Sequence, residues 1–206
     1  QKKRLLLQVG YRVIIQYRQI GHYLDQQDMK MRVETINSYI FIQKVEEHKE
    51  IKNKLLSLLD EIKNDKIESD NEKIEKSDYN LSVDVERKYG SMFQDIVRPY
   101  NENIKEFYKA EKILINNYWF QQYGDNGYHN FHIHPFSLLS NVYYLELENN
   151  NSTVFYDMQN KKEIKYNLEE GDLITFPSLL PHKSQINTNG RKTIISYNSD
   201  VIGIRI

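Results

Sequence analysis

The 206-residue chain contains no cysteine. It can therefore form no disulfide bond, and no metal site in it can use a thiolate ligand. His, Asp and Glu remain as the side chains that could bind a transition metal. The lack of cysteine also suits a reducing compartment, so the expected location is cytoplasmic.

Long apolar runs are missing as well. No stretch approaches the roughly 20 apolar residues that span a bilayer, so no membrane partner is expected. Residues 1–24 hold five basic side chains and no acid, a superficial likeness to a targeting peptide. Gln8, Gly10 and Arg12 interrupt the apolar run at 5–7 and no small-residue cleavage site follows, which excludes a secretory signal. We expect residues 1–32 to be a disordered or helical extension, with a basic or transit-like arm as the alternative.

An excess of either charge is also absent. The formal net charge is −1 and the pI is about 6.7, so nothing indicates nucleic acid as a partner. Hydrophobic residues make up 39% of the chain, enough for a core. We expect one domain over residues 33–206, acting on a small molecule or a protein that the sequence does not identify; it gives no oligomeric state either.

The first half of this domain shows two helical patterns. Residues 34–45 contain a short apolar run typical of a strand, and residues 46–64 place apolar side chains three and four apart, which predicts an amphipathic helix. Residues 65–78 are mostly charged or polar and are expected to be a solvated loop. A second helix is expected over 85–110, kinked or divided at Pro99.

Beyond residue 112 the pattern changes to short apolar or alternating runs separated by turn-forming sequences. Eight of the sixteen tyrosines lie here, and aromatic side chains pack well on a pleated sheet. The predicted strands are 116–123, 139–148, 152–157, 163–167, 172–177, 182–186 and 192–198. Many short strands with such turns predict a barrel or jelly roll, with the two helices packed outside it as a buttress.

Four of the six histidines fall in two places, at 129–134 and at 182. In an extended segment His132 and His134 share one side and His129 is out of phase, so His129 is expected at the surface or behind the ligands. His182 follows a predicted strand that could bring it to the same ion. The spacing predicts a metal site of His132, His134 and His182; buried histidines that only form hydrogen bonds are the alternative.

Arg191 lies nine residues after His182. A guanidinium is always charged and its planar fork of donors matches a carboxylate, so an inward-pointing Arg191 predicts an anionic ligand. An ordinary salt bridge or an exposed loop position is the alternative.

Residues 112–200 resemble the iron(II)- and 2-oxoglutarate-dependent oxygenases, particularly the branch with prolyl hydroxylases and uncharacterised bacterial and phage proteins. The order and spacing of several short motifs carry this resemblance. They are His132-Ile133-His134-Pro135 in place of the family's HxD, Tyr143-Tyr144-Leu145, the turn Glu170-Gly171-Asp172, and His182 followed by Arg191.

The resemblance implies a double-stranded β-helix and an enzyme that hydroxylates its substrate with release of succinate and CO2. It implies that His132 and His182 bind Fe(II) and that Arg191 binds the far carboxylate of 2-oxoglutarate. It also implies a contact between Tyr144 and the cosubstrate.

One departure from the family pattern concerns the third ligand, which is usually a carboxylate. Here His134 occupies that place, either as a ligand in a three-His site or as pocket lining, and Asp125 and Asp157 are substitute carboxylates. The spacing of Gly171, Pro177 and His182 also resembles a cupin motif. A cupin-like metalloprotein without 2-oxoglutarate is therefore the alternative, and a metal-free binding domain is a third.

Overall fold

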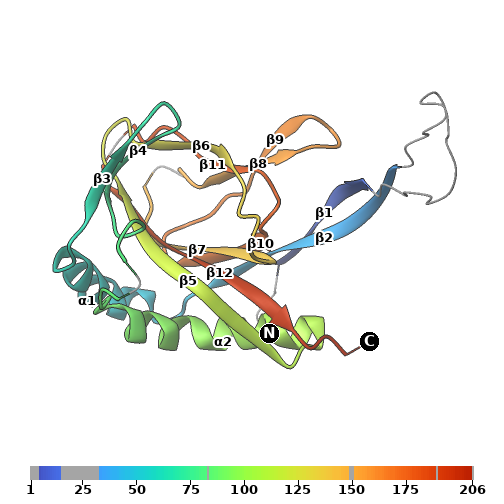
Figure 1. Cartoon of the computed structure of the whole chain (residues 1–206), viewed down its shortest axis with the longest axis horizontal. Helices are drawn as coiled ribbons and strands as arrows, with labels where there is room; N and C mark the ends of the chain where they lie inside the picture. The colour runs from blue at the N-terminus through green and yellow to red at the C-terminus, as the bar shows by residue number, and fades with distance from the viewer. Residues whose placement is uncertain (1–4, 15–32, 83, 149–150, 189, 206) are drawn as a thin grey trace, which may run out of the picture.

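The computed structural model describes residues 5–14, 33–82, 84–148, 151–188 and 190–205. These residues form one 12-stranded antiparallel sheet that curls round on itself (Figure 1). The strand order is β1-β2-β10-β7-β12-β5-β4-β6-β11-β8-β9, with β3 paired to β4. The strands are β1 (Leu5–Ile14), β2 (Val33–Lys44), β3 (Asp65–Glu68), β4 (Glu72–Ser77), β5 (Lys112–Tyr123), β6 (Tyr128–His132), β7 (Leu139–Glu146), β8 (Thr153–Asp157), β9 (Lys162–Lys165), β10 (Asp172–Pro177), β11 (His182–Ser184) and β12 (Lys192–Ile202).

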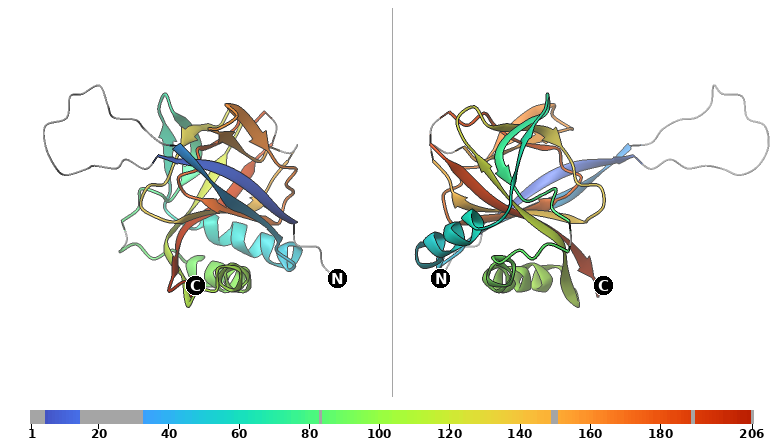
Figure 2. Two further views of the ribbon diagram at one scale, coloured as in Figure 1. Left: turned by 90° about the vertical axis from the view of Figure 1, so that its right-hand side faces the viewer. Right: turned by 60° about the vertical axis from the view of Figure 1, so that its left-hand side comes forward.

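Two helices, α1 (His48–Asp60) and α2 (Gly90–Tyr108), cover one face of this sheet (Figure 2). Leu55 and Leu59 of α1 join one buried cluster with Phe93 and Val97 of α2. The same cluster contains sheet residues, among them Tyr143, Ile195 and Tyr197. The apolar stripe that predicted each helix is therefore the surface that packs on the sheet, and the predicted buttress is confirmed.

A second buried cluster fills the inside of the curl. Along β7, Val142 and Tyr144 belong to this inner cluster, whereas Tyr143 and Leu145 belong to the outer one. Because both faces of the strand are covered here, the run Val142-Tyr143-Tyr144-Leu145 is apolar rather than alternating. The predicted class, mainly β with a jelly-roll core and flanking helices, is confirmed.

Residues 65–78 are not the predicted loop, because most of them form the hairpin β3–β4. Ile67 pairs with Ile74 across the two strands, and Ile74 is fully buried. Two isoleucines among charged neighbours give too short an alternation to be recognised in the sequence. This hairpin lies against β5 and β6, where it closes one side of the curled sheet.

Pro99 does not divide α2, which is continuous from Gly90 to Tyr108. Proline removes the hydrogen bond to the carbonyl four residues earlier, here that of Asp95. Both Pro99 and Asp95 are exposed, so water can satisfy that carbonyl.

Part of the expected N-terminal extension joins the sheet. Residues Leu5–Ile14 form β1, which pairs with β2 along its whole length. Residues 1–4 and 15–32 lie outside the described residues. The segment is rich in Leu, Val and Ile, and it covers an edge of β2 that would otherwise present unpaired backbone groups. Among the described residues, neither helix has the length and apolar character needed to cross a bilayer.

Candidate metal centre

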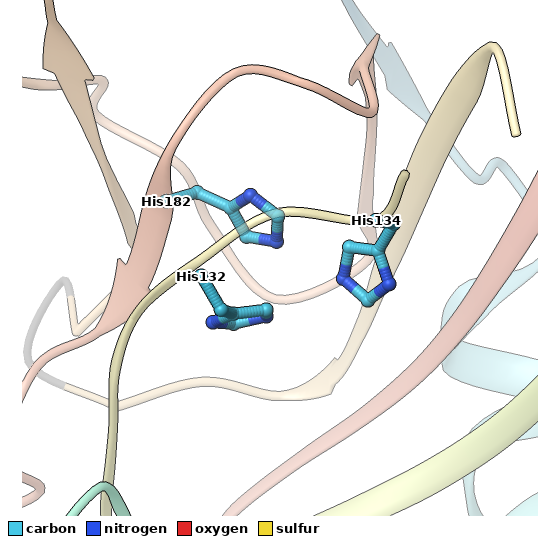
Figure 3. Close-up of side chains that lie close together, drawn as sticks. All are labelled: His132, His134 and His182. Carbon is cyan, nitrogen blue, oxygen red and sulfur yellow. The ribbon is translucent and has the colours of Figure 1, made fainter. Parts of the chain in front are cut away.

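The structure brings the three predicted metal-binding histidines together. His132 ends β6 and lies directly opposite His182, which begins β11. His134 follows two residues after β6, where its backbone N–H donates to the carbonyl of Ser178 at 2.9 Å. The three rings turn toward one shared space (Figure 3), and their ligand nitrogens all lie within 4.8 Å of one another.

Backbone carbonyls select which ring nitrogen is available in two of these residues. His132 Nδ1 lies 2.8 Å from the carbonyl oxygen of Asn130, and His182 Nδ1 lies 2.8 Å from that of Leu180. Because a carbonyl only accepts, each Nδ1 carries the hydrogen and each Nε2 keeps a free lone pair. This is the tautomer in which Nε2 can ligate a metal.

The three imidazoles are neutral near pH 7. Burial is the main cause: it places the pKa of His182 well below the ordinary value and lowers that of His132. Burial, followed by repulsion from His132, lowers the pKa of His134 to about 4. Three neutral nitrogen donors facing one point fit a divalent transition metal.

The two alternative carboxylates are not part of this cluster. Asp157 accepts hydrogen bonds from Gln159 and Asn160, so it caps the turn after β8. Asp125 neither lines the cavity described below nor belongs to the histidine cluster. Among the described residues, the cluster that could hold a metal ion therefore consists of His132, His134 and His182 and contains no carboxylate.

A fourth histidine lies beside the three. The ring of His129 stacks on that of His132, with centroids 3.8 Å apart and planes 9° apart. His132 pairs with His182 and His129 pairs with Ser184, so three steps along β6 match two along β11. This bulge reverses the side-chain phase. The expectation that His129 would be out of phase with His132 is therefore wrong.

A cavity of about 280 Å³ extends from the histidines into the curled sheet. Its wall includes the apolar residues Val142, Phe176 and Ile194. The buried part of the wall also carries polar groups. These are Tyr123, Thr153, Ser184 and Lys192. The cavity lining thus combines the three histidines with apolar side chains and with buried polar groups, a lysine among them.

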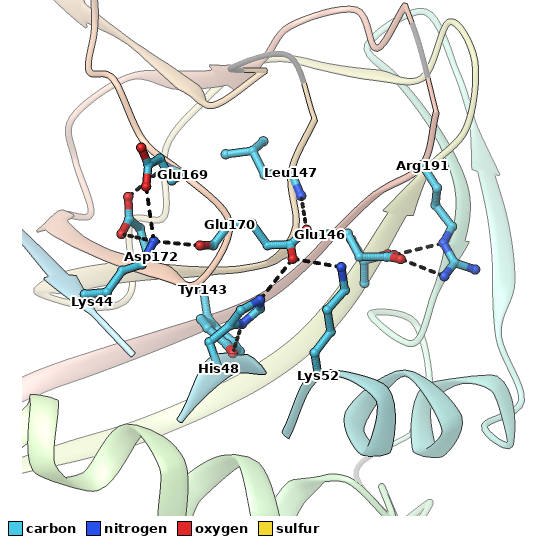
Figure 4. Close-up of polar contacts among 11 residues, drawn as sticks. Lys44, His48, Lys52, Tyr143, Glu146, Leu147, Glu169, Glu170, Asp172 and Arg191 are labelled. Carbon is cyan, nitrogen blue, oxygen red and sulfur yellow. Dashed lines mark hydrogen bonds and ion pairs between the residues drawn. The ribbon is translucent and has the colours of Figure 1, made fainter. Parts of the chain in front are cut away.

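Arg191 does not point into this cavity. Its Nε and one terminal nitrogen each donate to the Glu146 carboxylate at 2.8 Å, and its side chain is 45% exposed (Figure 4). The expectation of an inward Arg191 is wrong, and the salt-bridge alternative describes what the structure contains.

The adjacent residue, Lys192, takes the inward position. Lys192 is buried, its Nζ donates to Ser184 Oγ at 2.9 Å, and it lies 5.2 Å from the ring centroid of Tyr123. Burial lowers its pKa to about 7. Side chains alternate along a strand, and Lys192, Ile194, Ser196 and Asn198 all line the cavity. The period of two in β12, counted from Ile194, is the sequence signal that could have identified Lys192.

Tyr144 lies behind the cavity wall. Its hydroxyl donates to Thr153 Oγ1 at 2.7 Å and accepts from the Thr153 backbone N–H at 2.9 Å. Thr153 lines the cavity and Tyr144 does not. Burial raises the pKa of Tyr144 to about 12. Tyr144 therefore reaches a cavity ligand only through Thr153.

No protein-family profile and no curated protein matches the sequence. Solved structures do match the fold. An oxidoreductase of the 2OG-Fe(II) oxygenase family from Burkholderia pseudomallei aligns with a TM-score of 0.62 at 9% identity, over 81% of this chain and 88% of that one. A prolyl-4-hydroxylase from Pseudomonas putida aligns with a TM-score of 0.55 at 13% identity, over 80% and 93% of the two chains.

A third match is the non-heme alpha-ketoglutarate-dependent epimerase SnoN from nogalamycin biosynthesis. It aligns with a TM-score of 0.61 at 12% identity, over 78% of this chain and 76% of that one. The chain thus has the fold of the 2-oxoglutarate- and iron(II)-dependent oxygenases, prolyl hydroxylases among them.

Proposed function

We propose that the chain is an Fe(II)- and 2-oxoglutarate-dependent oxygenase. In this proposal His132, His134 and His182 bind the metal, and Lys192 takes the role first expected of Arg191. The observation that carries the proposal is one cavity lined by three neutral imidazoles and by a buried lysine.

Lys192 lacks a negative partner. None of the described residues forms an ion pair with it, and its contacts are the Ser184 hydroxyl and the face of Tyr123. A buried ammonium without a counter-charge is costly, which is why its pKa is lowered. A carboxylate in the cavity would supply the missing charge.

The strand spacing between His182 and the contact of Lys192 suits a short dicarboxylate. Ser184, which contacts Lys192, lies two residues after His182 in β11. Two residues of an extended strand span about 7 Å, and both side chains point to the same side. A five-carbon chain with a carboxylate at each end fits this separation.

The chain's residues would orient and shield the reaction. The Nδ1 hydrogens of His132 and His182 fix the ligand rings, Lys192 fixes the far end of the cosubstrate, and Val142, Phe176 and Ile194 exclude water. A bound iron would supply the oxidation that converts 2-oxoglutarate to succinate and CO2. Hydroxylation is the proposed outcome for a substrate not yet identified, small molecule or protein; SnoN shows that this fold also carries an epimerase.

Two substitutions at adjacent residues test the proposal. Calorimetry would measure 2-oxoglutarate binding to the Mn(II)-loaded protein. We expect Lys192→Met to weaken binding about ten-fold or more, the scale of a lost charged hydrogen bond. The matched control Arg191→Met, which removes an exposed pair with Glu146, should leave binding nearly unchanged. Loss of binding in the Arg191 variant alone would contradict the assignment.

The three-imidazole ligand set supports a second candidate, a cupin-like metalloprotein that does not use 2-oxoglutarate. It differs from the triad of two histidines and one carboxylate typical of the oxygenases. The same calorimetry separates the candidates. A protein that binds the metal tightly but shows no 2-oxoglutarate binding would support the second candidate.

A further inference from the structure

We propose that Glu72 and His129 are positioning residues for His132, acting through the stacked ring of His129. The inference rests on the metal site of the proposed function. It adds two residues that do not ligate the metal but tune one ligand.

The contacts connect the three side chains in a row. His129 is the ring parallel to His132, whereas His134 and His182 meet His132 at interplanar angles of 73° and 55°. Glu72 Oε2 lies 3.4 Å from His129 Nε2. The side chains of His129 and Glu72 are only 20% and 27% exposed, and both line the cavity. The carboxylate therefore reaches the ligand through one intervening ring.

The backbone holds this row in place. Glu72 is the direct partner of His129 in the register between β4 and β6. Close by, the Asn130 N–H donates to the carbonyl of Asn71 at 2.8 Å. The β6 bulge turns His129 to the side of His132. Strand pairing therefore fixes the positions of both Glu72 and His132, which lie on either side of His129 in this row.

The charge of Glu72 gives the row a chemical role. Glu72 is the only acidic side chain that lines the cavity among the described residues. A metal draws electron density from the ring that binds it, whereas a carboxylate close to an imidazole makes that ring richer in electrons. Parallel stacking should therefore favour His132 in its metal-bound state. The pair would supply some of the negative charge that a carboxylate ligand brings in most of the family.

The test measures Co(II) binding by competition titration, together with the visible spectrum of the bound ion. Glu72→Gln keeps the side-chain shape but removes the charge, and we expect Co(II) affinity to fall about ten-fold, with shifted absorption bands. His129→Phe keeps a stacked ring without the Glu72 contact and should cause a similar loss. The matched control is Glu75→Gln, an exposed acid on the same strand, which should leave both readouts unchanged.

A double variant decides whether Glu72 acts through His129. In the His129→Phe background, Glu72→Gln should cause no further loss of Co(II) affinity. Wild-type affinity and spectrum in Glu72→Gln, or an additive loss in the double variant, would overturn the inference. If the unaltered protein binds Co(II) and 2-oxoglutarate while these variants behave like it, only the positioning pair fails. If the unaltered protein binds neither, the proposed function fails.

Discussion

At the scale of single residues, the chemistry of the site depends on two things. One is which histidine nitrogens are free to bind a metal, and the other is whether the Lys192 ammonium has an anion to bind. The carbonyls of Asn130 and Leu180 hold the Nδ1 hydrogens of His132 and His182. Burial keeps these rings neutral, so they can bind a metal near pH 7 without first losing a proton. Lys192 is the opposite case, a buried cation whose charge becomes favourable only when an anion enters the cavity.

Replacing the histidines tests the statement that their rings can bind a metal. His132→Ala and His182→Ala should each abolish stoichiometric metal binding, measured by elemental analysis of the dialysed protein, while circular dichroism shows a folded sheet. His134→Ala should weaken binding strongly if all three rings are ligands. Wild-type metal content in both of the first two variants would contradict the site assignment.

Lys192 makes cosubstrate binding pH-dependent. Its folded pKa is about 7, below the value of about 10.4 for an unfolded lysine. Between these values the unfolded chain binds the extra proton, so the unliganded protein should gain stability as pH rises through this window. A dianion favours the ammonium form. The affinity of the Mn(II)-loaded protein for 2-oxoglutarate should therefore fall on the order of ten-fold from about pH 6.5 to about pH 8.5.

The control for this pH dependence is the Lys192→Met protein. It should bind 2-oxoglutarate weakly at every pH, with no decline over the same range. A parent protein whose affinity is flat across the range would show that Lys192 does not face the bound anion.

At the scale of helices and strands, some features could be predicted from the local sequence pattern, whereas others depend on which strands pair with one another. The position of His182 was predictable because it follows the recognisable apolar run 172–177, whereas β6 was not among the predicted strands and His132 was placed by assuming an extended segment at 131–134. The hairpin β3–β4 was not predictable, since Ile74 is the one buried apolar residue of its two strands. Arg191 was predicted to bind an anion because its chemistry fits a carboxylate, but strand phase decides which of two adjacent side chains points inward, and that residue is Lys192. The phase of His129 depends on a bulge that only pairing with β11 reveals.

The attachment of α1 to the sheet supports a test at this scale. His48 of α1 contacts the hydroxyl of Tyr143 at 2.7 Å and Glu170 at 3.1 Å, and Lys52 contacts Glu170 at 2.8 Å (Figure 4). Gly171 has a φ of +86°, and a Cβ there would meet the His48 ring at 2.9 Å. This network therefore requires glycine at the turn into β10.

Gly171→Ala should destabilise the protein by about 1–3 kcal/mol, because it adds backbone strain and a clash with His48. Urea denaturation would measure the loss. Since the turn lies outside the cavity wall, Co(II) affinity of the folded variant should stay close to that of the parent. A variant as stable as the parent would show that the turn can change its conformation freely.

At the scale of the whole molecule, the curled sheet separates two tasks. Its outer face packs on α1 and α2 and forms a continuous core, whereas its inner face holds the cavity and the cluster of three histidines. Polar residues such as Lys192 and Ser184 can therefore lie on the inner face of the sheet without interrupting the core between sheet and helices. One fold can host several different reactions, so the reaction must be argued from the residues of the site.

The central claim is that this cavity holds 2-oxoglutarate beside a metal bound by histidines. The most direct measurement is succinate formation from 2-oxoglutarate by the protein with Fe(II) and oxygen, without added substrate. The account predicts slow succinate release that disappears in His182→Ala, falls sharply in Lys192→Met and persists in Arg191→Met. A folded, iron-loaded parent protein that neither binds 2-oxoglutarate nor forms succinate would contradict it.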